Sequence, residues 1–166
     1  MAKSDALSDL LRYNQKVVFC GTAAGAVSAK KRQYYAGPGN KFWRTLSEIK
    51  LTDRILKPHE FKKLLDFNIG LTDLVKKQSG PDSKIIFREK DRIEFEKRIK
   101  KKKPKYLCFN GKRAAQEYLK HKVKYDLQSE SIEKTRIFVA PSTSGAANRF
   151  WDIKIWRELS RLIRQK

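Results

Sequence analysis

The sequence predicts an α/β layered fold with a mostly parallel sheet. Four short apolar runs rich in β-branched or aromatic residues have the length of buried strands, and they lie at residues 17–20, 69–75, 106–109 and 137–140. The first, third and fourth runs are followed by Gly, Asn or Pro-Ser, as is typical where a buried strand enters a turn. Stretches with helical spacing separate the runs, and strands that alternate with helices favour a parallel sheet covered by helices.

The helical stretches have apolar residues three or four positions apart. They lie at residues 42–49, 61–65, 93–99, 114–119 and 155–163. Pro58 precedes the second stretch and suits a first helical position. The lysine run at residues 100–103 follows the third, and we interpret it as a solvated helix end, because cations suit the negative pole of a helix. Residues 76–90 are expected to form a loop that enters a helix.

Length and composition limit the class of protein. The 166 residues suit a single domain over residues 1–166, and 40% hydrophobic residues exclude wholesale disorder. No apolar run approaches the roughly 20 residues of a membrane span, and the first residues lack the apolar stretch of a signal peptide. We therefore expect an intracellular protein, in the cytoplasm or nucleoid, or in the nucleus if the source is eukaryotic. Two cysteines are too few for a disulfide framework, a four-cysteine zinc site or an iron–sulfur cluster.

The charge indicates an anionic partner. The chain has 39 Lys plus Arg against 18 Asp plus Glu, a formal net charge of +21. Such a charge repels itself in the compact state, and neutralised phosphates would release counterions, so nucleic acid is the leading candidate. A ribosomal-type protein, an anionic membrane surface and a lysine-rich proteome remain open at this point.

Ligands of α/β sheets bind at the carboxyl ends of the strands, so the residues after each run carry the functional argument. Small residues at 21–25 (GTAAG) let a ligand approach the backbone, or form a tight strand-to-helix connection. This segment is neither a P-loop nor GxGxxG. Asn110 carries a donor and an acceptor that match the amide edge of a pyrimidine, or it caps the next helix.

Two further segments combine aromatic, glycine and hydroxyl residues. Tyr35 precedes a Gly-Pro loop and lies outside the neighbouring helical stripe, so we expect its ring to face a ligand, while Phe42 and Trp43 pack in the core. Residues 141–149 (PSTSGAANR) could bind phosphate oxygens or cap a helix. His59 and His121 lie in charged helices, and we expect no catalytic or metal role for either.

Taken together, these segments resemble the mismatch-specific uracil and thymine DNA glycosylase family of the uracil-DNA glycosylase superfamily. The likeness covers most of the chain and rests on VVFCGTAAG, YYAGPGNKFWRTL, IGLTDLV, YLCFNGKRA and VAPSTSGAANR, in that order. It implies a three-layer α/β/α sandwich around a short, mostly parallel four-stranded sheet. It also implies excision of uracil, or of a related deaminated or mispaired base, from DNA by cleavage of the N-glycosidic bond without a metal or cofactor. Our first hypothesis is therefore a uracil glycosylase with hypoxanthine as a minor substrate, and the likeness together with the high charge favours a monomer.

The resemblance assigns site residues. Backbone groups of Thr22 and Ala23, with the side chains of Tyr35 and Asn110, would hold the extruded base. Single- or double-stranded DNA would be bound by a larger polar and cationic set, which comprises Asn40, Lys112, Ser142, Ser144, Asn148 and Arg149.

Two departures from the family pattern matter. The family has an Asn that holds the attacking water where this chain has Ala23, so either the protein is slow or inactive, or Asp73 takes over with Thr72 beside it. Asp73 could instead cap a turn. A non-catalytic protein that recognises damaged DNA is therefore the alternative function, and a structural DNA- or RNA-binding protein is a third.

The second departure concerns the bulky residue with which the family fills the gap left in the duplex by the extruded base. This chain has small residues at 145–147 instead, with Asn148 or Arg149 as substitutes.

Overall fold

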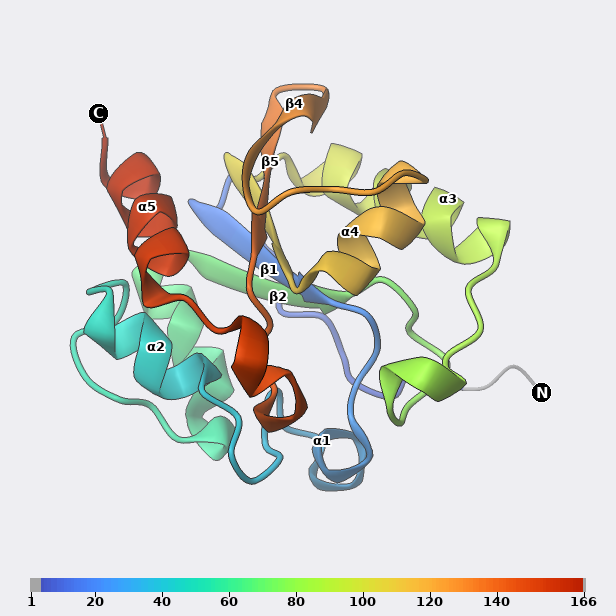
Figure 1. Cartoon of the computed structure of the whole chain (residues 1–166), viewed down its shortest axis with the longest axis horizontal. Helices are drawn as coiled ribbons and strands as arrows, with labels where there is room; N and C mark the ends of the chain where they lie inside the picture. Colours follow the sequence, from blue (N-terminus) through green and yellow to red (C-terminus); the bar gives the residue numbers. More distant parts are fainter. Residues whose placement is uncertain (1–3, 166) are drawn as a thin grey trace.

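The computed structural model describes residues 4–165, and its centre is one five-stranded sheet with strand order β2-β1-β3-β5-β4. The strands are β1 (Val17–Gly21), β2 (Ile69–Asp73), β3 (Tyr106–Asn110), β4 (Asp126–Ile132) and β5 (Thr135–Ala140). β2, β1, β3 and β5 run parallel, and β4 pairs antiparallel with β5 at the edge (Figure 1).

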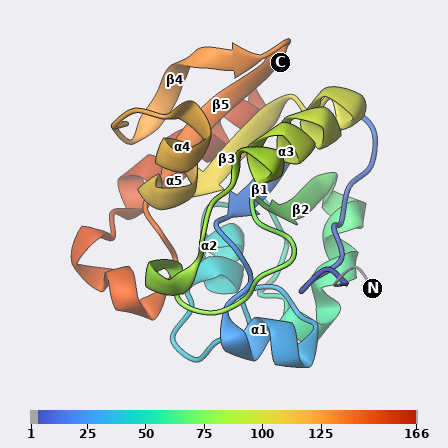
Figure 2. The ribbon, with the colours of Figure 1, turned by 90° about the vertical axis from the view of Figure 1, so that its right-hand side faces the viewer.

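Helices cover both faces of the sheet, which confirms the three-layer α/β/α architecture (Figures 1 and 2). Side chains on one face of the strands pack against α2 (Phe42–Glu48), η1 (Pro58–Phe67) and α5 (Ile153–Arg164). Those on the other face pack against α3 (Glu89–Lys102) and α4 (Lys112–Leu119). The parallel strands are buried on both faces, and this explains their continuous apolar runs. Two short helices, α1 (Ala26–Lys31) and η2 (Asp82–Lys84), lie in connections that follow β1 and β2.

The sheet has one strand more than the sequence predicts. β4 was missed because it reads DLQSESI, which is polar, half exposed and interrupted by a bulge, so it has neither an apolar run nor a regular alternation. The segment behind Pro58 is helical as predicted, but η1 is a 3-10 helix. β2 ends at Asp73, two residues before the predicted end at Val75. Within the described part of the chain, no helix is long and apolar enough to cross a membrane.

The register of the sheet places the ends of its strands side by side. Gly21 pairs with Asp73 of β2, and Cys20 pairs with Phe109, one residue before Asn110 of β3. Asn110 in turn pairs with Ala140 of β5. The residues that end four parallel strands therefore share one edge of the sheet, as the rule for ligand sites requires.

Candidate active site

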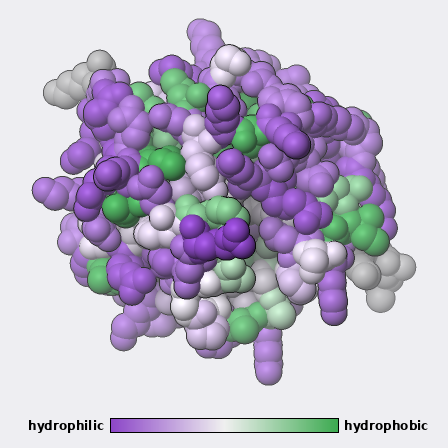
Figure 3. Space-filling view, viewed as in Figure 1, coloured by the Kyte–Doolittle hydropathy of each residue, from purple (hydrophilic) through white to green (hydrophobic). Residues whose placement is uncertain are grey.

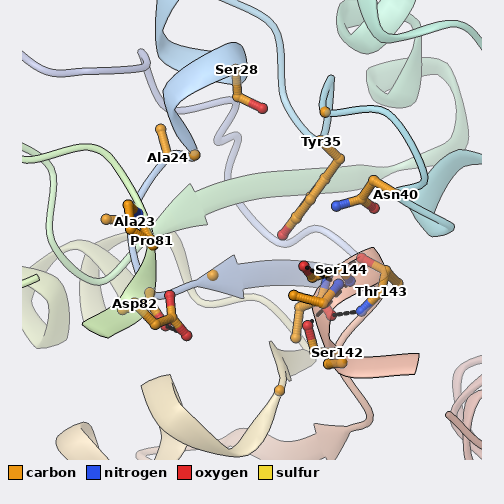
Figure 4. Close-up of a pocket in the computed structure, with 18 of the residues that line it drawn as sticks. Ala23, Ala24, Ser28, Tyr35, Asn40, Pro81, Asp82, Ser142, Thr143 and Ser144 are labelled. Carbon is orange, nitrogen blue, oxygen red and sulfur yellow. Dashed lines mark hydrogen bonds between the residues drawn. The ribbon is translucent and has the colours of Figure 1, made fainter. Parts of the chain in front are cut away.

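A cavity of about 680 Å³ opens at the carboxyl ends of the parallel strands, within the range of about 300–1,000 Å³ of small-molecule sites. Figure 4 shows its two sides: Ala23, Pro81 and Asp82 lie on one, and Tyr35, Asn40 and the serine-rich segment 142–144 lie on the other. In the space-filling view hydrophilic side chains cover most of this face of the molecule, and paler residues gather near its centre and below (Figure 3).

Three neighbouring strands form the inner end of the cavity. β2 contributes the carboxylate of Asp73, β1 contributes Gly21 and β3 contributes the amide of Asn110. Gly21 has no side chain, and this matters, because a Cβ atom there would lie 2.8 Å from Oδ1 of Asp73 and 3.7 Å from the hydroxyl oxygen of Tyr35. Both oxygen atoms therefore face one point above Gly21, where a side chain would collide with the carboxylate.

Tyr35 reaches this point from a strained backbone. Its φ of 51° lies in the left-handed region, which costs free energy for a bulky residue and is often found at binding sites. The ring packs on Phe42, with centroids 4.0 Å apart. Among residues 4–165 the buried Tyr35 hydroxyl has no hydrogen-bond partner. Burial and then the charge of Asp73 raise the pKa of Tyr35 well above its usual range, against the opposing effect of the neighbouring Asn110 side chain, so the hydroxyl keeps its proton at neutral pH.

The Asn110 amide is oriented by Thr143. Its Nδ2 donates to Oγ1 of Thr143 at 2.9 Å, and its Oδ1 accepts from the backbone N–H of Thr143 at 3.0 Å. An amide side chain has two N–H donors and two acceptor lone pairs, so these contacts leave one donor and one lone pair for a ligand. That is the pattern needed to read an adjacent carbonyl and N–H on a base edge.

Asp73 is buried, with 4% of its surface exposed. Burial is the main cause that raises the pKa of Asp73 to about 6, and the positive charges of Lys76 and Arg98 oppose it. Those two cations form ion pairs with Asp9 at 2.6 and 3.2 Å, and Arg98 also donates to the backbone carbonyl of Asp73 at 2.8 Å. Asp73 therefore has the environment of a carboxylate that is ionised at pH 7 and protonated in mild acid.

Comparisons with known proteins agree with this geometry. The family model of the uracil DNA glycosylase superfamily matches residues 8–160. The chain belongs to that superfamily. The solution NMR structure of a candidate uracil DNA glycosylase from Methanosarcina acetivorans is also similar, with a TM-score of 0.65 and 26% sequence identity, over 99% of this chain and 100% of that chain.

The superfamily fold brings the four expected base-binding residues together. Thr22, Ala23, Tyr35 and Asn110 all line the cavity, as does Asp73. The Thr22 hydroxyl donates to Asp82 at 3.4 Å, and Ala23 contributes no polar side-chain atom.

Thr72 is not brought into the cavity. Alternation along β2 turns its side chain to the opposite face of the sheet from Asp73. There its hydroxyl donates to Asp9 at 2.7 Å. From this position Thr72 does not contact a ligand in the cavity. Its hydrogen bond to Asp9 helps to hold in place the end of β2 that carries Asp73.

The expected DNA-binding residues divide into two groups. Asn40, Lys112, Ser142 and Ser144 line the cavity, whereas Asn148 and Arg149 do not line it and lie on η3 (Gly145–Phe150). Several of these polar groups also hold the loops in place. Asn40 accepts from the backbone N–H of Phe42 at 3.0 Å, and Ser144 caps η3 by accepting from Ala146 at 3.3 Å.

The loop holding Asn40 and the serine-rich segment also contact each other, because the N–H of Lys41 donates to the carbonyl of Thr143 at 2.9 Å. On η3, Asn148 accepts a hydrogen bond from the Lys41 ammonium group, and the Arg149 guanidinium lies over the Phe150 ring at 4.9 Å. Lys112 thus lines the cavity itself, whereas Lys41 and Arg149 lie on the segments beside it.

Sequence reasoning missed part of one side of the site. Pro81 and Asp82 line the cavity from the loop after β2, which the N–H of Gly80 fastens to the carbonyl of Ala24 at 2.9 Å. Burial raises the pKa of Asp82, and Arg113 opposes that rise. The cluster SGPDS was a turn signal, but nothing in it indicates that the turn folds back over β1. Phe150, which is 55% exposed at the mouth, was missed too.

Proposed function

We propose that the protein is a monofunctional DNA glycosylase of the mismatch-specific uracil and thymine branch. It would extrude uracil, or a related deaminated base, from DNA and hydrolyse its N-glycosidic bond to leave an abasic site. The observation that supports this most directly is the arrangement at the inner end of the cavity. There the Asp73 carboxylate and the Tyr35 hydroxyl face one point above Gly21, beside the oriented amide of Asn110.

Base recognition follows from the remaining hydrogen-bonding capacity of Asn110. Its one donor and one lone pair complement the carbonyl and N3–H on the edge of uracil. The Tyr35 ring, supported from behind by Phe42, supplies an aromatic surface for the extruded base. Such stacking contributes about 1–3 kcal/mol per base.

Bond cleavage needs a water molecule and stabilisation of two developing charges. As the bond between the sugar C1′ and the base nitrogen breaks, its electron pair leaves with the base, and positive charge develops on the sugar. The ionised Asp73 offsets that charge, orients the water that attacks C1′ and accepts its proton. The Tyr35 hydroxyl is a second group able to hold this water. The Asn110 amide stabilises the leaving base anion, which takes a proton from solvent.

In this proposal the substrate is DNA, bound through cations near the cavity mouth such as Lys112 and Arg149.

Residues 145–147 are too small to fill the gap left by an extruded base. We therefore expect weak dependence on an opposite guanine and useful activity on single strands. Comparison of excision from G·U, A·U and single-stranded substrates tests this, and strict G·U selectivity would contradict it.

A second candidate function rests on Ala23. Because this side chain cannot hold water, a protein that binds uracil-containing DNA without cleaving it would have the same cavity. To distinguish the two functions, a uracil-containing oligonucleotide is incubated with the protein and then heated in alkali, which breaks the strand at any abasic site. The same oligonucleotide with thymine in place of uracil is the control. Cleavage at the uracil position supports the glycosylase, and selective binding without cleavage supports the second function. Unselective, salt-sensitive binding alone would contradict both.

A further inference from the structure

We propose that the end of the sheet opposite the cavity is a second DNA-binding surface, which holds a DNA segment other than the one engaged at the site. We call this surface the basic end. It consists of exposed residues from three separate segments, namely Arg12, Tyr13, Lys16, Lys101, Lys103, Lys105, Lys134 and Arg136. The proposal rests on the proposed function only for the choice of DNA over RNA.

Backbone hydrogen bonds bring the three segments together at the amino ends of the strands. The N–H of Asn14 donates to the carbonyl of Lys102 at 2.8 Å, and the N–H of Lys105 donates to the carbonyl of Gln15 at 2.9 Å. The N–H of Arg136 donates in turn to the carbonyl of Lys105 at 3.0 Å. The cations therefore form one surface in the fold although they are spread over more than a hundred positions of the chain.

This surface lacks compensating negative charge. In the described residues none of its cations has a carboxylate within 4.0 Å, whereas cations such as Lys76 and Arg98 elsewhere are paired. The segments 12–16 and 101–106 hold no acidic residue, and 133–136 holds Glu133 alone. Like charges gathered in this way destabilise the folded chain through mutual repulsion. A polyanion that neutralises several of them together would relieve that repulsion and release counterions.

The aromatic groups of this surface favour nucleic acid over an anionic membrane. Tyr13 is 68% exposed and stands between Arg12 and Asn14, where its ring can lie against a sugar or an accessible base. The guanidinium of Arg136 lies over the Tyr106 ring at 5.8 Å, which orients a planar donor for a phosphate group. The surface also lacks the apolar helical face with which proteins enter a lipid interface.

The basic end and the cavity lie at opposite ends of the same strands, so a straight duplex laid across the mouth of the cavity would not pass over the basic end. The cavity lies past Gly21, Asp73 and Asn110, whereas the basic end surrounds the first residues of the same five-residue strands. At about 3.3 Å per residue the strands alone separate the two by roughly 16 Å. Figure 1 shows the β4–β5 turn, which belongs to the basic end, at the top and α1, which contributes to the cavity lining, at the bottom. DNA at the basic end is therefore a second segment, and the protein would bridge two segments.

A bridging assay tests this. A uracil-free biotinylated duplex on beads is saturated with the full chain, and retention of a second, fluorescent duplex is measured. The variant K16Q/K105Q/R136Q is expected to lower retention at least about tenfold and to reduce the slope of log affinity against log salt by about three. The control K50Q/K57Q/K62Q removes the same charge from exposed lysines elsewhere and is expected to retain the second duplex.

Failure of the second DNA-binding surface can be distinguished from failure of the proposed glycosylase function. Excision of uracil under single-turnover conditions is expected to be the same in wild type and in K16Q/K105Q/R136Q, and equal thermal unfolding shows that the variant is folded. Equal retention by wild type and this variant would overturn the second surface whatever the excision rate. So would a loss that the control shares, or preferential capture of single-stranded RNA or of phosphatidylglycerol vesicles by the basic end.

Discussion

The Asp73→Asn substitution separates the cost in stability of a buried carboxylate from its catalytic benefit. Burial raises the pKa of Asp73 from 3.8 to about 6. At 1.36 kcal/mol per pKa unit, the ionised carboxylate lowers the free energy of unfolding by about 3 kcal/mol at neutral pH. The folded chain binds more protons at this group than the unfolded chain between about pH 4 and 6, so its contribution falls as pH rises through that window.

Asparagine has the same shape and no charge, so the variant is expected to gain stability relative to wild type at pH 8 and to lose that gain near pH 4. Urea denaturation of both proteins at the two pH values measures this difference. The exposed Asp53→Asn variant is the control, and we expect no comparable pH-dependent gain from it.

The same variant is expected to lower the excision rate by about 100-fold or more, because the carboxylate no longer orients water or accepts its proton. Single-turnover excision from a uracil-containing oligonucleotide measures this rate. A stability difference between the variant and wild type that does not change with pH would refute the reasoning about burial. Excision at the wild-type rate would remove Asp73 from the mechanism.

Three further predictions concern the inner end of the cavity. Excision by the wild type is expected to rise with pH through about 6 and then level off, as Asp73 ionises, and a rate that falls over this range would contradict the assignment. Gly21→Ala is expected to abolish excision with a folded protein retained, because its methyl group would lie 2.8 Å from Asp73 Oδ1; Gly37→Ala, where a Cβ meets nothing within 4 Å, is the control. Tyr35→Phe keeps the ring and is expected to lower the single-turnover rate about tenfold with little change in substrate affinity; an unchanged rate would exclude the hydroxyl from holding water.

Much of the fold could be predicted because buried parallel strands leave a strong signal. Their continuous apolar runs, and the helical stripes between them, indicate both the elements and their order. β4 could not be predicted in this way, because an exposed edge strand needs no apolar pattern, and its pairing with β5 depends on the turn that joins them.

The part of the candidate site that lies at the ends of the strands could be predicted from the sequence. Asn110 could be named from the sequence because it is a polar residue that directly follows an apolar run, and Asp73 because it is a carboxylate within the apolar run 69–75 that could replace the family Asn missing at Ala23. Thr72 was placed beside Asp73 because it matches a Thr of the family pattern, but pleating sends adjacent side chains of a strand to opposite faces of the sheet. Asp82 was missed because its distance from Thr22 in the chain is sixty residues, and only the folded loop brings the two together.

By itself, the sequence determined the layered architecture, the edge of the sheet that carries the site and the strongly cationic character of the chain, since each follows from local pattern or composition. The tertiary structure alone decided that the carboxylate of Asp73 and the hydroxyl of Tyr35 face one point above Gly21, and that unpaired cations from three segments meet at the opposite end of the sheet. Both depend on which strands are neighbours and in what register, and hydrogen bonds between distant segments set that register.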